Sequence, residues 1–245
     1  MDFPVRINKY LAIKNISTRR GADELIRAGK VKINGRKAKL GDQVTIKDKV
    51  EVGKEMQSKK YSYFAFNKPI GVVTHSPQIG EKDIKSFLSK IDQNNDLFPL
   101  GRLDKDSSGL IILTNDGRIT DKMLNPKFYH EKEYSVEVDH PINNTFLLKI
   151  KQGFNMGKEK VRPAKIRKTP QLSSGQADPT KFDIILTEGK NRQIRRMCAA
   201  LSYKVLSLKR IRIINIILGN LPKGQIRPIE GGELKTFIES LGLKN

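Results

Sequence analysis

Hydrophobic positions in the first sixty residues change from a helical to a strand spacing. Apolar residues at positions 7, 10 and 11 recur on one helix face. A second helix is predicted between Ser17, a candidate N-cap, and Gly29, a residue type that often ends helices. Strand-like alternation follows, with a type I′ turn signal at Asn34-Gly35, and it continues through Ile46 to Val52. We therefore expect two short helices and a small β unit.

The remaining chain mixes strands and helices without the regular alternation of a βαβ fold. Predicted strands cover residues 61–66, 110–113, 134–138, 182–186 and the apolar run 205–218. Predicted helices cover residues 84–91, 146–153, 193–201 and 234–241, and residues 171–180 have the composition of a loop. Segregated, strand-rich elements indicate an α+β fold whose mixed, largely antiparallel sheet is flanked by helices.

A polar stretch without periodicity, residues 53–60, separates the two patterns. We predict a small domain at residues 1–60 and a larger domain at residues 61–245.

Composition adds a polyanionic partner to this picture. The chain has 47 Lys and Arg against 26 Asp and Glu, a formal net charge of +21. Such an excess favours nucleic acid or a membrane surface as a partner. No apolar run reaches spanning length and no signal-peptide core begins the chain, so we expect a cytoplasmic protein. One cysteine and three scattered histidines exclude an internal disulfide and predict no metal site.

Positive charge is densest in the predicted small domain, which has 16 Lys and Arg against 7 Asp and Glu. Arg19, Arg20 and six further basic residues cluster around the second helix and the hairpin, where one face could meet phosphates. A solvated basic surface is the alternative. The segments Arg6–Leu11, Ser17–Arg20 and Gly29–Gly35 together resemble the S4 RNA-binding domain, which grips structured RNA.

Two segments of the larger domain concentrate reactive side chains. Residues 99–110 form a polar loop between apolar anchors and contain Asp104 and Asp106. These two residues are equally typical of a tight turn. Residues 189–197 begin a helix with three arginines at positions 192, 195 and 196, for which a phosphate-facing stripe is the simple alternative.

Taken in order, four segments resemble the pseudouridine synthases of the RsuA/RluF group, most closely the RluF-type enzymes of 23S ribosomal RNA. The segments are residues 67–71, 101–110, 132–134 and 191–197. The resemblance implies a monomeric isomerase that needs no cofactor or metal. It would flip a uridine out of ribosomal RNA, and of a transfer RNA as a second possible substrate, and rejoin the base to ribose through C5.

The resemblance also assigns roles to individual residues. Asp104 is the essential carboxylate and Arg195 the cation that keeps it ionised, while Tyr134 stacks on the base. Whether Asp104 attacks C1′ or C6, or assists elimination to a glycal, stays open. The substrate-binding residues implied are Arg102, which fills the place of the flipped base, Leu208 beneath the base, and Arg192, Arg19 and Arg20 on the RNA backbone.

Simpler readings exist for several of these residues. Tyr134 and Leu208 also fit a hydrophobic core, and Arg102 also fits a phosphate contact. A ribosome-assembly or RNA-chaperone protein without catalysis is the main rival for the function. Methyl transfer or deamination is a weaker rival, because the sequence shows neither a Gly-rich cofactor loop nor a Cys/His zinc set.

Overall fold

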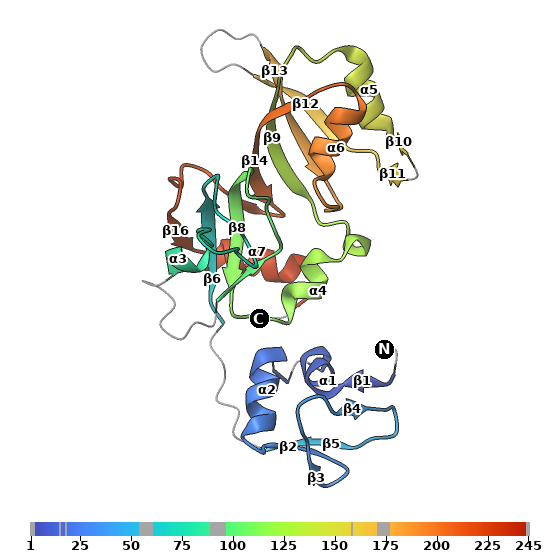
Figure 1. Cartoon of the computed structure of the whole chain (residues 1–245), viewed down its shortest axis with the longest axis vertical. Coiled ribbons are helices and arrows are strands. Elements are labelled where there is room, and N and C mark those ends of the chain that lie inside the picture. Colours follow the sequence, from blue (N-terminus) through green and yellow to red (C-terminus); the bar gives the residue numbers. More distant parts are fainter. Residues whose placement is uncertain are drawn as a thin grey trace. The chain divides into compact units, whose positions relative to one another are not determined.

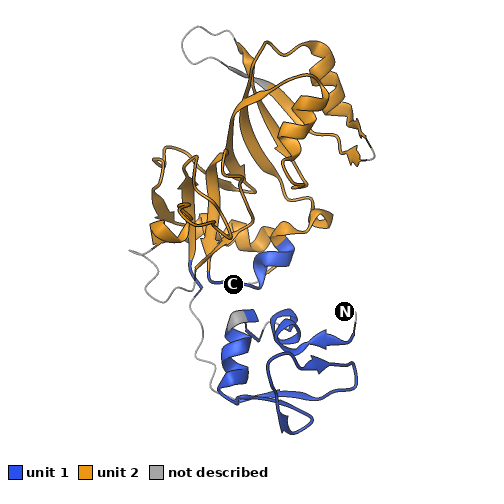
Figure 2. Cartoon of the chain, viewed as in Figure 1, with its two compact units in different colours: residues 1–62, 115–122 blue, residues 63–114, 123–245 orange. Residues whose placement is uncertain are grey.

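The structure is a computed structural model, and the residues it describes are 3–14, 16–17, 19–53, 61–88, 97–157, 159–170 and 177–243. The chain separates into two compact units (Figure 2). The small unit comprises residues 1–62 and 115–122, and the large unit comprises residues 63–114 and 123–245. Residues 115–122 join the small unit partly through a hydrogen bond from the Ser62 amide to Asn115 Oδ1, 2.9 Å long. The predicted domain limits at residue 60 do not include this segment and stay a prediction.

The small unit contains the two helices and the β unit that the sequence predicts (Figure 1). Gly29, with φ +67°, follows the second helix, and the positive φ values of Asn34 and Gly35 make the hairpin turn. Ile46 is 79% exposed and lies in a turn, so the strand-like alternation predicted there does not extend through it. The elements are β1 Val5–Arg6, α1 Ile7–Ile13, α2 Arg19–Arg27, β2 Val31–Ile33, β3 Arg36–Lys37, β4 Gln43–Val44 and β5 Val50–Val52.

A mixed sheet forms the centre of the large unit. Within the described residues nine strands belong to it, in the order β12-β13-β9-β14-β8-β6-β16, with β15 on β14 and β7 on β8. The pair β14–β8 is parallel and the other described pairs are antiparallel, which confirms the predicted fold class. These strands are β6 Tyr63–Lys68, β7 Phe98–Leu100, β8 Ser108–Thr114, β9 Lys132–Val138, β12 Lys165–Pro170, β13 Ala177–Leu186, β14 Val205–Ile213, β15 Ile216–Ile217 and β16 Ile226–Pro228.

Burial on both faces explains why the middle of β8 is a continuous apolar run. All seven residues of β8 are buried, so neither face alternates with polar positions. Phe146 of α5 and Met197 of α6 belong to the same core cluster as strand residues Val136 and Phe182. The remaining elements are α3 Lys85–Leu88, α4 Ile119–Leu124, the 3-10 turn η1 Pro126–Phe128, α5 Asn144–Gln152, β10 Phe154–Met156, β11 Glu159–Val161, α6 Gln193–Ala200 and α7 Gly231–Ser240.

Two sequence predictions fall partly on residues outside the described part of the large unit. Within that part, the helix expected at residues 84–91 is α3 Lys85–Leu88, and residues 89–96 are not described. The loop expected at residues 171–180 is wrong for residues 177–180, which belong to β13, and residues 171–176 are not described. Within the described ranges, every helix is too short or too polar to cross a membrane.

Candidate active site

A cavity of about 420 Å³ opens in the large unit between the loop that precedes β8, the strands β9 and β14, and the start of α6. Asp104, Tyr134 and Leu208 line it together with the predicted RNA contacts Arg102 and Arg192. Five of the eight predicted site residues therefore meet around one hollow, although they are up to 106 positions apart in the sequence.

Hydrogen bonds hold the loop in place around Asp104. The buried Thr74 hydroxyl donates to the Leu103 carbonyl at 2.7 Å, and the Leu103 amide donates back to that hydroxyl oxygen at 3.2 Å. On the other side, the Ser107 amide donates to the Asp104 carbonyl at 3.0 Å and closes a turn. The turn geometry that the sequence suggests is therefore present, and the same turn delivers the Asp104 carboxylate to the cavity.

Lys68 supports the neighbouring segment from inside the core. Its side chain is fully buried, and Nζ donates to the carbonyls of Pro69 and Val72 at 2.9 and 2.8 Å. Burial lowers the pKa of Lys68 to about 8, although the negative charges of Asp104 and Asp106 act in the opposite direction. Lys68 therefore places a buried cation close to the loop that contains Asp104 and Asp106.

The arginine closest to Asp104 is Arg192. Its Nη1 lies 3.7 Å from Asp104 Oδ2, and its Nη2 lies 2.9 Å from Asp106 Oδ2. Arg192 adopts a left-handed conformation with φ 46° immediately before α6. This turn brings its guanidinium to both carboxylates.

Arg195 contacts Asp106, and among the described residues no ion pair joins it to Asp104, so the structure does not bring the two members of the predicted Asp104–Arg195 pair together. Arg195 Nε lies 3.2 Å from Asp106 Oδ2, and the two terminal nitrogens donate to the carbonyls of Asp106 and Val205. These two backbone contacts fix the guanidinium on the Asp106 side of the loop. Burial favours a raised pKa for Asp106, but the Arg192 hydrogen bond and the charges of Arg195 and Arg192 outweigh it and lower the pKa.

The base-contacting residues predicted from the sequence lie on adjacent strands. Tyr134 of β9 is 8% exposed and Leu208 of β14 is 6% exposed, and both line the cavity. Each residue also belongs to the hydrophobic core. Both residues therefore belong to the hydrophobic core and also form part of the cavity wall.

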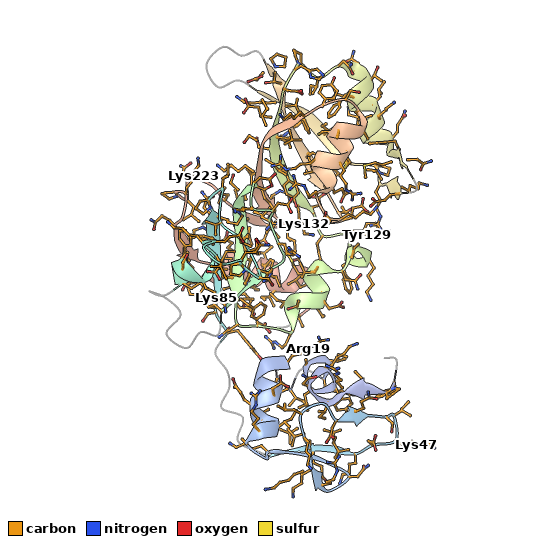
Figure 3. All side chains as sticks on the ribbon, in the orientation of Figure 1. Arg19, Lys47, Lys85, Tyr129, Lys132 and Lys223 are labelled. Carbon is orange, nitrogen blue, oxygen red and sulfur yellow. The ribbon has the colours of Figure 1, made fainter. Side chains whose placement is uncertain are left out.

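One lysine and one arginine on the strands that line the cavity were not assigned a role from the sequence. Lys132 lies two residues before Tyr134 on β9, and Arg210 lies two residues after Leu208 on β14. Because strand side chains alternate between faces, residues two apart point to the same side. The two-residue period of side chains along a strand is the sequence signal that could have identified Lys132 and Arg210. Lys132 is labelled in Figure 3.

The predicted RNA contacts of the small unit lie at the start of α2. Arg19 is exposed there, and the side chain of Arg20 lies outside the described part (Figure 3). Arg19 does not line the cavity. No cluster of three His, Cys, Asp or Glu side chains that could hold a metal ion occurs among the residues described.

Comparisons with known proteins agree with this site. The family model described as RNA pseudouridylate synthase matches residues 62–200, and the S4 domain model matches residues 5–50. The dual-specificity RNA pseudouridine synthase RluF of Escherichia coli O6:H1 is 39% identical over 237 residues, 95% of this chain and 78% of the relative. Ribosomal large subunit pseudouridine synthase B of Bacillus subtilis is 36% identical over 94% of each chain.

A solved structure described as a pseudouridylate synthase has the same fold. It covers 97% of this chain and 99% of its own, with a TM-score of 0.67 and 30% sequence identity. The non-catalytic rival for the function has no support in these comparisons. The chain therefore belongs to the RNA pseudouridylate synthase family, as an RNA isomerase with an N-terminal S4 domain.

Proposed function

We propose that this enzyme converts a uridine of large-subunit ribosomal RNA to pseudouridine, with Asp104 as the carboxylate that acts on the target nucleotide. The observation that carries the proposal is the placing of Asp104 in one cavity with Tyr134 and Leu208. This arrangement gives a flipped uridine a carboxylate, an aromatic ring and an apolar surface at once.

The other carboxylate in the cavity is less suited to the reaction. Glu188 is 4% exposed and accepts a hydrogen bond from Gln193. Arg162 and Lys190 lie 3.6 and 3.4 Å from its second oxygen. Asp104 has a single ion pair among the described residues, with Arg192 at 3.7 Å, which leaves its oxygens accessible to a substrate.

Positioning of Asp104 is shared between two arginines. Arg192 contacts Asp104 directly, and Arg195 holds the next carboxylate, Asp106, on the same loop. We assign Arg195 an indirect role, because its guanidinium is engaged by Asp106 and by the Val205 carbonyl. Tyr134 stacks on the base, and the exposed Arg102 occupies the place that the base leaves.

The RNA class follows from the charge and from the relatives. The formal net charge of +21 and the S4 domain fit a large structured RNA. One relative is named a ribosomal large subunit enzyme and another a dual-specificity enzyme. We therefore propose 23S ribosomal RNA as the substrate of a monomeric enzyme, with a transfer RNA as the candidate second substrate.

The test compares two isosteric changes on one loop. Asp104→Asn removes the reactive charge and is expected to abolish pseudouridine formation, with RNA affinity changed less than about twofold. Asp106→Asn should keep measurable turnover, reduced about tenfold, because it loosens Arg192 and Arg195 without touching the reacting group. Pseudouridine is mapped in 23S RNA treated with each variant. Appreciable turnover by Asp104→Asn would refute the assignment, and modification of no site in 23S RNA by the wild type would refute the proposed substrate.

A further inference from the structure

We propose that Lys132 and Arg210 form an oxyanion-binding subsite that holds the carbonyl oxygens of the target uracil while its bond to the ribose breaks. This inference rests on the family's isomerase activity and gives two further residues a part in it. Both side chains are buried and both line the cavity that contains Asp104 and Tyr134.

Arg210 is buried with part of its guanidinium unused. It is 3% exposed, its Nε donates to the Leu110 carbonyl at 2.7 Å, and its Nη1 lies 3.4 Å from the Arg102 carbonyl. Nη2 is buried without a hydrogen-bond partner. The Ser107 hydroxyl, which lines the same cavity, is also buried without a partner. Buried donors are nearly always satisfied, so these two point to a ligand that completes them.

Lys132 brings a second cation to the same place. It is 8% exposed, and the hydrogen bond from its Nζ to the His130 carbonyl is a long one, 3.4 Å. Burial and the positive charge of Arg210 lower the pKa of Lys132 to about 8. Lys132 is therefore still protonated at neutral pH, and it lies close enough to Arg210 for the two charges to repel.

Neither cation forms an ion pair with a carboxylate in the described part of the chain. The carboxylates of the cavity are engaged elsewhere, Asp104 by Arg192 and Glu188 by Lys190 and Arg162. Two like charges buried without a counter-ion destabilise the free protein. The cost is offset when a ligand brings negative charge to the cavity.

The reaction supplies that charge on the base. When the C1′–N1 bond breaks, its electron pair passes to the uracil ring and is shared by the O2 and O4 carbonyl oxygens. The ring then rotates, C5 bonds C1′, and the C5 proton leaves while N1 gains one, so the atoms balance. Attack on C6 also places negative charge on a carbonyl oxygen. The subsite is therefore useful in each of the routes open for Asp104, because donors aimed at developing charge accelerate a reaction most.

The test uses the full chain with Lys132→Gln, Lys132→Arg and a control, Lys149→Gln, at an exposed position of α5. Lys132→Gln is expected to lower the single-turnover rate about 100-fold, as expected for loss of one oxyanion donor. RNA Kd should stay close to wild type, and Tm should stay the same or rise, because the change removes an unpaired buried cation. Lys132→Arg should recover most of the rate, and Lys149→Gln should match wild type.

A second measurement distinguishes negative charge on the uracil base from negative charge on a backbone phosphate as the group that Lys132 binds. RNA with 5-fluorouridine at the target has a base that carries negative charge more easily, so breakage of its C1′–N1 bond should depend less on Lys132. The subsite is supported if Lys132→Gln slows that cleavage less than it slows cleavage of uridine. An unchanged rate with uridine overturns the proposal. A loss confined to Kd, or an equal loss with both bases, also overturns it and assigns the two cations to a backbone phosphate or to structure alone. The wild type on 23S RNA tests the proposed substrate separately.

Discussion

At the scale of single residues, the cavity is defined by cations that outnumber the carboxylates. Arg102, Lys132, Lys190, Arg192 and Arg210 line it, against Asp104 and Glu188. A site with excess positive charge attracts a polyanion and stabilises negative charge that forms on the substrate. The protonation state of the buried lysine should therefore be visible in the pH dependence of the enzyme.

The pKa of Lys132 predicts a loss of activity in base. This lysine is protonated below its pKa of about 8 and neutral above it, and Arg210 is the charged group that lowers the value further after burial. We expect kcat/KM to fall as pH rises through about 8, since kcat/KM reports the free enzyme. Lys132→Arg should remove the fall, because arginine stays charged. A pH profile of Lys132→Arg that still falls near pH 8 would assign the titration to another group, with Lys68 the first candidate.

Residue types and their order could be predicted from the sequence, but side-chain pairing could not. Asp104, Tyr134 and Leu208 do meet at one cavity, as the motifs indicate. The sequence could not show which arginine reaches which carboxylate, because the left-handed turn at Arg192 and the backbone contacts of Arg195 arise only from the folded chain. Burial of Arg210 likewise depends on the strands packed around it.

At the scale of elements, the parallel pair β8–β14 connects the loop that contains Asp104 and Asp106 to the strand that carries Leu208 and Arg210. Gly109 of β8 pairs with Arg210 of β14, and the backbone of Gly109 has a φ of +104°. A Cβ at this position would lie 2.7 Å from the Arg210 amide nitrogen and closer still to its carbonyl oxygen. The two strands can approach this closely only because the residue is glycine.

We therefore expect Gly109→Ala to lower the free energy of unfolding by at least about 3 kcal/mol, from backbone strain and steric overlap together. The matched control is Gly219→Ala, where φ is also positive, at +56°, but the added Cβ meets nothing within 4 Å. Strain alone should cost that variant about 1 kcal/mol. Urea unfolding measures both variants. Equal losses at the two positions would show that the overlap at β8–β14 is relieved by movement of the strands.

Elements with a strong apolar pattern were predictable, and polar ones were not. The buried run of β8 and the alternation of β9 made both strands visible in the sequence. The strand β12 begins Lys165-Ile166-Arg167 and lies at one end of the sheet order, and it was not predicted. A strand at a sheet edge needs few apolar side chains, so its pairing with β13 is a property of the assembled sheet.

At the scale of the whole molecule, charge and chemistry are divided between two units. The cavity lies entirely in the large unit, while residues 1–60 hold 16 of the 47 Lys and Arg. The S4 domain match covers residues 5–50 and the synthase match residues 62–200. Affinity for RNA and chemistry on the base should therefore be separable by substitution.

Arg19 and Arg20 at the start of α2 provide the test of that separation. In the full chain, Arg19→Gln with Arg20→Gln should weaken RNA binding and make the slope of log K against log salt shallower by about 0.7 to 0.9 for each phosphate that the variant no longer neutralises. The rate with saturating RNA should stay within about twofold of wild type, because interactions equal in ground and transition state do not change kcat.

Lys47→Gln with Lys49→Gln is the control, because it removes the same charge from the segment between Val44 and Glu51. This pair should leave the slope closer to wild type. An equal change in slope for both pairs would show that the small unit attracts RNA by its overall charge and that α2 makes no particular contact.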